Sequence, residues 1–435
     1  METNLKTKIL GIIQKQPNYS KLAFDINIID QMPLNAHQAF TWKKIDIVCS
    51  NTNFDSFITV NDEIKKIYSE IGKINSQYLI NFIFEKCHIK FWNENITLDH
   101  SISFNECNIN INVQDTKIDE IYLLKKNFYN CTFENLSLLS SEVKIIQIDL
   151  YSTFIDLLQI AIMEIVNNEN SKIEIHNSYI KKIMVQDAIF KSDFTIYTTK
   201  IDDITIKNVD FEALSEFNEV TFQDEFDFRE ITYKGLTLFD KCVFNTKAEF
   251  EYIIFEKFTS FRGSTFNQGL NLDYTSSDKE INFFGTNGLE SNESRENTSQ
   301  ETYRIIKNNF EKIGNKIEAN HYFTLELEKH RSDIWNRPDI SLQLLRDGIV
   351  SFFHWISSNH SSNWFLALFW IYMVSFFTNL FLGNELSINN VFKYINILSE
   401  IKDFDKSYLA MVLNKVSLGY LYYQFLTAVR KDTRK

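Results

Sequence analysis

The chain has few residues that favour tight turns, because only 11 of its 435 residues are glycine and 3 are proline. Its five cysteines are odd in number and form no C-x-x-C pair, which argues against a disulfide framework. This cysteine usage favours a reduced, cytosolic setting. The formal net charge is −12 at pH 7, so positive charge that would neutralise phosphates is scarce, and we expect no nucleic-acid partner.

Motifs for catalysis are also missing. The eight histidines belong to no H-E-x-x-H motif, and the chain contains no nucleophile elbow and no phosphate-binding loop. We therefore expect no enzymatic activity, no metal and no cofactor. The N-terminal stretch METNLKTKILGIIQKQPNYS contains only a short, broken apolar segment without a small-residue cleavage site, so we expect no signal peptide.

Phenylalanine is abundant, with 39 residues, and many of the rings recur at a fixed step. On an α-helix, an offset of five residues would put two interleaved series about 140° apart, so one helical stripe cannot hold both. On a strand, the residue two before each ring shares its face, and that residue is usually small, as Cys242 is before Phe244. The rings therefore predict strands whose core includes two series with a period of eleven: Phe217, Phe228, Phe239, Phe250 and Phe261, and Phe211, Phe222, Tyr233, Phe244, Phe255 and Phe266.

A short strand followed by a corner, repeated every five or six residues, indicates a coil that stacks on itself. The chain resembles the pentapeptide-repeat family of right-handed quadrilateral β-helices, whose motif places a small residue two before a central Leu or Phe. The pairs Cys87/Ile89, Cys107/Ile109 and Cys131/Phe133 match, and Cys87 and Cys107 are separated by one 20-residue coil of that family. Two steps of eleven predict coils of about 22 residues within the phenylalanine series, with corners at 245–247 and 256–257. We expect the cysteines to pack inside the coil.

The periodicity changes along the chain, and it predicts four regions. Residues 1–80 form a capping region that is irregular or made of short helices, and 81–275 form the β-helix, with an irregular middle. Residues 276–348 contain a polar linker and an amphipathic helix, which a capping box of Thr298 and Glu301 begins. Residues 349–435 form a membrane domain. The expected fold class is a mainly β N-terminal domain followed by a helical linker and C-terminal transmembrane helices.

Two apolar stretches predict membrane spans near 364–382 and 408–429. Asn414 and Lys415 interrupt the second stretch and are candidate pore residues. Interface anchors are expected at both ends of the spans, and the basic residues among them predict a cytoplasmic C-terminal tail and β-helix: Trp355, Trp364, Arg430, Lys431, Arg434 and Lys435.

The ending LGYLYYQFLTAVRKDTRK is similar to the closing segment of membrane-attached bacterial pentapeptide-repeat proteins, some of which carry a two-helix, ion-channel-like segment. This resemblance implies an inner (plasma) membrane location. The preferred interpretation is a non-enzymatic scaffold that is anchored in the lipid bilayer and binds an unknown cytoplasmic protein.

Two alternatives stay open at this stage. One is a subunit of a homo-oligomeric channel or pore, although the chain lacks the TVGYG filter of potassium channels. The other is an acidic rod that mimics DNA and inhibits a DNA-binding enzyme, as gyrase-protecting pentapeptide proteins do. The oligomeric state in detergent separates a pore from an anchor, because two spans per chain enclose a pore only in an assembly.

Overall fold

The computed structural model describes residues 2–16, 24–31, 42–54, 57–74, 78–92, 96–98, 101–114, 117–140, 142–162, 171–335, 342–359, 363–385, 387–404 and 407–432. The chain divides into two compact units, Met1–Asn297 and Thr298–Lys435. The first unit is a parallel β-solenoid of about 8 turns, and the second consists of helices. The expected fold class is thus confirmed for the N-terminal β-solenoid and the C-terminal helical region.

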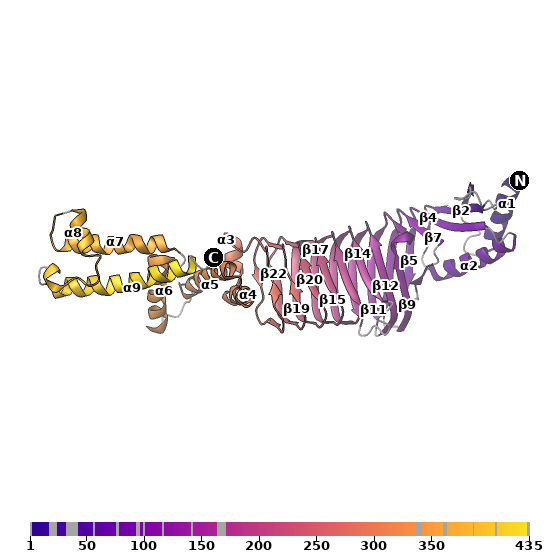
Figure 1. The fold of residues 1–435 in the computed structure, drawn as a ribbon. Helices are drawn as coiled ribbons and strands as arrows, with labels where there is room; N and C mark the ends of the chain where they lie inside the picture. Colours follow the sequence, from indigo (N-terminus) through magenta and orange to yellow (C-terminus); the bar gives the residue numbers. More distant parts are fainter. Residues whose placement is uncertain are drawn as a thin grey trace. The chain divides into compact units, whose positions relative to one another are not determined.

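Strands from successive coils pair in parallel and form three sheets, in which they lie side by side (Figure 1). The 13-stranded sheet contains β3 (Asn53–Phe54), β5 (His88–Trp92), β8 (Asn108–Gln114), β11 (Thr132–Ser140), β13 (Phe154–Ile162), β15 (Tyr179–Phe190), β17 (Lys200–Phe211), β19 (Thr221–Tyr233), β21 (Val243–Phe244), β22 (Ala248–Phe255), β24 (Thr265–Phe266), β25 (Leu270–Asn271) and β26 (Ser276–Ser277). The 9-stranded sheet contains β6 (Ile96–Thr97), β9 (Lys117–Leu124), β12 (Glu142–Tyr151), β14 (Lys172–His176), β16 (Asp193–Tyr197), β18 (Ser215–Asn218), β20 (Thr237–Asp240), β23 (Thr259–Ser260) and β27 (Ile281–Asn282).

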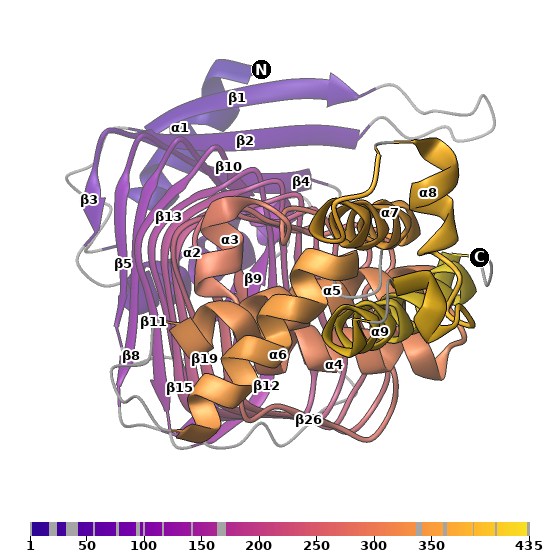
Figure 2. The ribbon, with the colours of Figure 1, turned by 90° about the vertical axis from the view of Figure 1, so that its left-hand side faces the viewer.

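The third sheet begins the solenoid at its N-terminal end (Figure 2). Its strands are β1 (Phe24–Gln31), β2 (Trp42–Ser50), β4 (Tyr78–Glu85), β7 (Ile102–Asn105) and β10 (Phe128–Tyr129), and β1 pairs with β2 in antiparallel register. Helices α1 (Glu2–Ile13) and α2 (Phe57–Ile74) belong to the same region, and a 3-10 turn, η1 (Lys125–Asn127), precedes β10. The prediction of an irregular or helical cap for 1–80 was therefore incomplete, because β2 and β3 already pair with strands of the stack.

The register measures the length of each coil. His88 pairs with Asn108 near the N-terminal end of the stack, and Val243 pairs with Thr265 in the phenylalanine series. The numbers of these partners confirm both expected lengths, the 20-residue coil and the 22-residue coil. Corners at 245–247 and 256–258 separate β21, β22 and β23, as the ring spacing predicts.

Between Phe190 and Phe283, the interior of the solenoid contains rows of stacked aromatic rings, with one ring of each row per coil. Phe239 stacks on Phe217 at 5.0 Å and on Phe261 at 5.3 Å between ring centroids. A second row continues from Phe222 through Phe244, at 4.8 Å. Every ring of the two predicted series is buried, so the sequence-predicted core is confirmed: Phe211, Phe217, Phe222, Phe228, Tyr233, Phe239, Phe244, Phe250, Phe255, Phe261 and Phe266, with Cys242 beside them.

A regular corner explains why small residues recur in the solenoid. A residue in the left-handed region begins the corner in many coils, as Lys241 (φ 54°) and Gly263 (φ 69°) do. The next residue points inward and is usually small, and its side chain or main chain can bond to the adjacent coil, as when Cys242 N donates to Ser264 Oγ at 2.9 Å. All five cysteines are buried and free of disulfides, and Cys87, Cys107, Cys131 and Cys242 occupy this row. Their predicted packing role fits this arrangement.

The solenoid ends later than the sequence indicates. The repeat was expected to stop at 275, but β26 pairs with β22 and β27 pairs with β23, and α3 (Asn292–Asn297) follows. The rings become sparse there, because Leu272 and Ser277 replace aromatic residues one coil after Phe250 and Phe255. The expected linker at 276–290 is therefore the last part of the stack.

The helical unit contains α4 (Gln300–Lys312), α5 (Lys316–Trp335), α6 (Leu342–Ser358), α7 (Trp364–Phe381), α8 (Ile388–Lys393), η2 (Ile401–Phe404) and α9 (Tyr408–Asp432). Ser299 caps α4 by accepting from Thr302 N at 3.0 Å, so the capping box predicted at Thr298 was wrong by one residue. The amphipathic helix is also divided in two, because Gly314 (φ 78°) ends α4 in the left-handed region. Ile313 and Ile317 are therefore exposed, although their spacing predicts burial.

Candidate functional site

The candidate site is the pair of helices α7 and α9, which run antiparallel. Trp364 lies against Phe425 (ring centroids 6.4 Å apart), while Thr378, near the other end of α7, bonds to Asn414. Their contact surface has an apolar centre of Ile371, Leu418 and Leu421. The two helices thus form a hairpin in which the start of α7 lies against the end of α9.

A polar seam crosses this apolar surface. Asn414 Nδ2 donates to Thr378 Oγ1 at 3.0 Å, and Asn414 is only 2% exposed. Asn379 and Ser375 are fully buried on the same side of α7, and Ser375 Oγ donates to the Ile371 carbonyl at 3.0 Å. Small and polar side chains that bond across two helices are typical of helix association within a bilayer.

The segment between α7 and α9 folds back onto α9. Lys415 Nζ donates to the Ser399 carbonyl at 2.6 Å, and Tyr422 Oη donates to the Ile395 carbonyl at 3.0 Å. Tyr394, which is 1% exposed, donates to the Asp403 carbonyl at 3.1 Å. This segment contains the short helix α8 and the 3-10 turn η2. The candidate pore residues Asn414 and Lys415 are thus both bonded within one chain.

The outer faces of the hairpin are apolar as well. On α9 the exposed large apolar side chains follow helical spacing, and on α7 they include the ring of Phe377 at 56% exposure. The exposed set on α9 is Tyr408, Leu409, Val412, Leu413, Val416, Tyr420, Tyr423 and Leu426. A helix that is apolar on both the packed and the open face is typical of a buried or membrane-embedded helix.

Among the described residues, one helix, α7, is long and apolar enough to cross a membrane. Helix α9 has 25 residues, which is sufficient length, but it does not reach the same hydropathy, and Asn414 and Lys415 lie within it. The ends of both predicted spans agree with helix ends to within three residues. Both membrane spans stay predictions.

The predicted interface anchors occupy several environments. Trp355 on α6 is 39% exposed and lies under the Arg331 guanidinium, which is 4.4 Å from the ring centroid. Trp364 begins α7 and is 40% exposed. Arg430 is exposed, whereas Lys431 is half-buried over the Phe323 ring at 4.3 Å. Arg434 and Lys435 lie outside the described residues.

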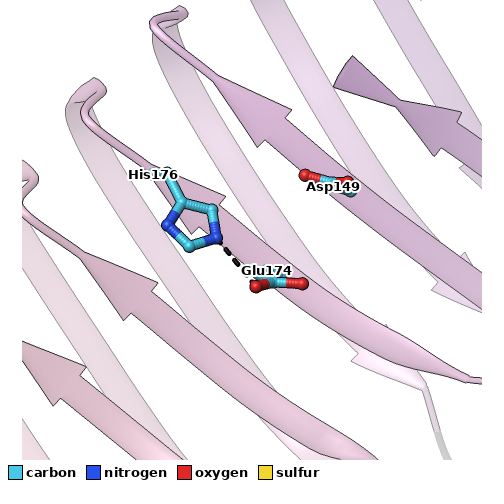
Figure 3. Close-up of side chains that lie close together, drawn as sticks. All are labelled: Asp149, Glu174 and His176. Atoms are coloured by element: carbon cyan, nitrogen blue, oxygen red, sulfur yellow. Dashed lines mark hydrogen bonds and ion pairs between the residues drawn. The ribbon is translucent and has the colours of Figure 1, made fainter. Parts of the chain in front are cut away.

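One cluster of potential metal ligands lies on the outer face of the solenoid (Figure 3). Asp149 and Glu174 are partners on adjacent strands, and the ligand atoms of these two residues and His176 lie within 4.8 Å of one another. His176 Nε2 is 2.8 Å from Glu174 Oε1, and Lys172 forms an ion pair with the same carboxylate. Burial opposes the charged form of Glu174, but these two partners together hold its pKa below the usual 4.5. Lys172, Glu174 and His176 thus form a network of polar side-chain interactions along β14.

Sequence reasoning missed a pair of exposed tyrosines on the solenoid. Tyr252 and Tyr274 have rings stacked at 4.8 Å, and their side chains are 53% and 73% exposed. Both residues adopt the left-handed conformation, with φ of 56° and 59°. Their separation in the sequence equals one coil, and this is the signal that would have found them.

Comparison with known proteins finds no matching family model, no similar curated protein and no similar solved structure.

Proposed function

We propose that this chain is a non-enzymatic scaffold in which the α7–α9 hairpin anchors the β-solenoid to a lipid bilayer. The observation that carries the proposal is the apolar outer face of α9 on a helix whose inner face is already packed. The open side chains of Leu413, Val416 and Leu426 are 58%, 68% and 62% exposed. Exposure of apolar surface to water costs about 25 cal/mol per Å², and this cost is absent when the same surface lies in hydrocarbon.

The antiparallel pairing supports a second span. Helix α7 has 18 residues, about 27 Å of helix, which approaches the thickness of a bilayer core. Because α9 lies along α7 from Asn414 to Phe425, a bilayer that surrounds α7 would also surround that part of α9. The Asn414–Thr378 bond and the bonds of Lys415 and Tyr422 to carbonyls would pair these three donors within hydrocarbon, where unpaired donors are costly.

The proposed location is the inner (plasma) membrane, with the solenoid on the cytoplasmic side. Arg430 and Lys431 follow the second span, and basic residues of this kind favour the cytoplasmic side. The five buried, unpaired thiols are consistent with a reducing compartment. The pentapeptide-repeat resemblance adds the expectation that this chain is a bacterial membrane protein.

The tyrosine pair is the part of the solenoid that we propose as the contact for a protein partner. Tyr252 and Tyr274 occupy the same corner position in successive coils, where positive φ is a regular feature of the solenoid, and their rings are open to solvent. Ile254, two residues after Tyr252, is 45% exposed. Rigid tyrosines with an apolar neighbour are enriched at protein interfaces.

Vesicle flotation tests the anchor. The full chain should rise with neutral phosphatidylcholine vesicles and resist extraction by alkaline carbonate, because the hairpin enters the hydrocarbon. A variant with Val416→Glu and Phe377→Glu should be released, since it places two charges on the outer face. Lys257→Glu, an exposed change on the solenoid, is the matched control and should float. Carbonate release of the unmodified chain would contradict the proposal.

A crosslinking experiment tests the partner contact. A photoreactive amino acid at Tyr274 should give one discrete crosslinked protein in the native host, and the same group at Lys257 should not. Replacing Tyr252 by Asn, which tolerates positive φ, should abolish that product without unfolding the solenoid. A product that is equal at both positions would refute the contact.

A further inference from the structure

A cavity of about 410 Å³ lies within the helical unit, between the α4–α5 hairpin and the C-terminal end of α9. Its lining comes from the last turn of α4, the first turns of α5 and the last turns of α9. The lining residues are Glu311, Lys316, Ala319, Asn320, Thr427, Arg430 and Lys431. Segments that are far apart in the sequence thus contribute to one hollow.

The charge of this cavity is strongly unbalanced. Three cations, Lys316, Arg430 and Lys431, converge on it, and Glu311 is the single carboxylate in the lining. Asn320 adds an amide that can donate hydrogen bonds. Thr427 Oγ1 already donates to the Tyr423 carbonyl at 2.8 Å, so this hydroxyl offers only its lone pairs. The donors and cations suit an anion with several oxygens.

Lys431 is the most enclosed of the three cations. Its Nζ lies 4.3 Å from the centroid of the Phe323 ring, and Lys307 Nζ lies 5.4 Å from the same centroid. Burial lowers the pKa of Lys431, and its charge contributes to the lowered pKa of His354 on α6 after the larger effect of burial. A cation with reduced hydration interacts more strongly with an anion than a fully hydrated one.

We propose that this cavity binds a phosphate group, with Arg430 and Lys431 as the principal contacts and Lys316 and Asn320 on the opposite wall. Arginine and lysine are the usual ligands of phosphate oxygens. The inference rests on the proposed membrane anchor for one point, the source of the phosphate. The cavity follows the second span at 408–429, where an anionic phospholipid headgroup would lie, and basic pockets at the cytoplasmic ends of spans bind such headgroups. The same chemistry would accept free phosphate.

Binding by the full chain in neutral detergent tests the proposal. The probes are dihexanoyl phosphatidylglycerol, dihexanoyl phosphatidylcholine and inorganic phosphate, and the readout is the dissociation constant from calorimetry. We expect the unmodified chain to bind phosphatidylglycerol at least tenfold more tightly than phosphatidylcholine. The double variant Arg430→Gln, Lys431→Gln should lose that preference. Lys312→Gln, an exposed cation of α4 outside the cavity lining, should stay within twofold of the unmodified chain.

The outcomes separate the sources and the two proposals. Binding of inorganic phosphate that competes with phosphatidylglycerol would identify a free anion as a ligand of the same cavity. No binding of phosphatidylglycerol or of inorganic phosphate, or equal weakening by Lys312→Gln, would overturn the cavity as a phosphate site. The double variant should still float with neutral vesicles and keep its helical circular dichroism. If neither the unmodified chain nor the double variant floats, the anchor is contradicted. The binding measured in detergent would still test the cavity independently.

Discussion

Replacement of Phe239 by Ala tests the stacked interior most sharply. Phe239 is fully buried, and four rings surround it: Phe217 at 5.0 Å, Phe250 at 5.2 Å, Phe261 at 5.3 Å and Phe228 at 6.0 Å between centroids. Phenylalanine-to-alanine changes in cores cost about 3–5 kcal/mol. Because rings of two adjacent coils lose a partner at once, we expect about 4 kcal/mol, within that range.

Hydrogen exchange followed by mass spectrometry measures this loss locally. A change of about 4 kcal/mol corresponds to about a thousandfold faster exchange, since about 1.4 kcal/mol is tenfold. The effect should be concentrated in β18, β20 and β23, because the coils of a solenoid contact only their neighbours. Exchange in β5 and β8 should change little.

The control is Phe258→Ala in the same coil. Phe258 is 45% exposed at a corner, so its truncation should change stability by less than about 0.5 kcal/mol. Equal acceleration of exchange by the two variants would refute the assignment of the ring rows to the interior. Uniform acceleration over the whole solenoid would refute the nearest-neighbour stack.

Three other changes address separate parts of the chain. Glu326→Ala should lower the free energy of unfolding of the helical unit by about 3 kcal/mol in urea titrations, because the partly buried Lys307 loses its carboxylate partner. Glu301→Ala removes an exposed ion pair with Arg304 and should lower the free energy of unfolding by less than about 1 kcal/mol. Glu174→Gln should destabilise the solenoid at neutral pH, and the difference should shrink as pH falls below 4.5, since the native carboxylate has the lowered pKa. The five thiols should resist alkylation at pH 8 until denaturant is added, because all are buried and burial raises the pKa of Cys242; rapid labelling of the native chain would contradict their packing role.

The solenoid could be predicted where one coil repeats without interruption. From Phe217 to Phe266 every coil places its rings at the same points, so the period of eleven gives both the coil length and the corners. The signal is lost in the N-terminal region because α2 is inserted between β3 and β4, so that Lys43 and its partner Tyr78 are separated by more than one ordinary coil. Asp149 and its partner Glu174 are separated by a longer coil than Lys172 and its partner Asp193 in the next coil, and no uniform period indicates this change.

The helical unit shows a different limit of sequence reasoning. The composition predicts the start of α7 and the end of α9, because the first apolar stretch begins directly after Asn363 and basic residues follow Val429. The pairing of Asn414 with Thr378 depends on which faces of two helices meet, and no spacing in the sequence specifies it. The phosphate cavity likewise needs α5 and α9 to be brought together by tertiary packing.

The depth of the α7–α9 hairpin in a bilayer is the sharpest test of the membrane anchor. A nitroxide side chain at Val416, on the open face of α9, would report its collisions with oxygen, which concentrates in hydrocarbon, and with a water-soluble nickel complex. We expect collisions with oxygen to dominate at Val416 and collisions with the nickel complex to dominate at Lys257 on the solenoid. Nickel-dominated collisions at Val416 in reconstituted full-length protein would contradict the membrane anchor.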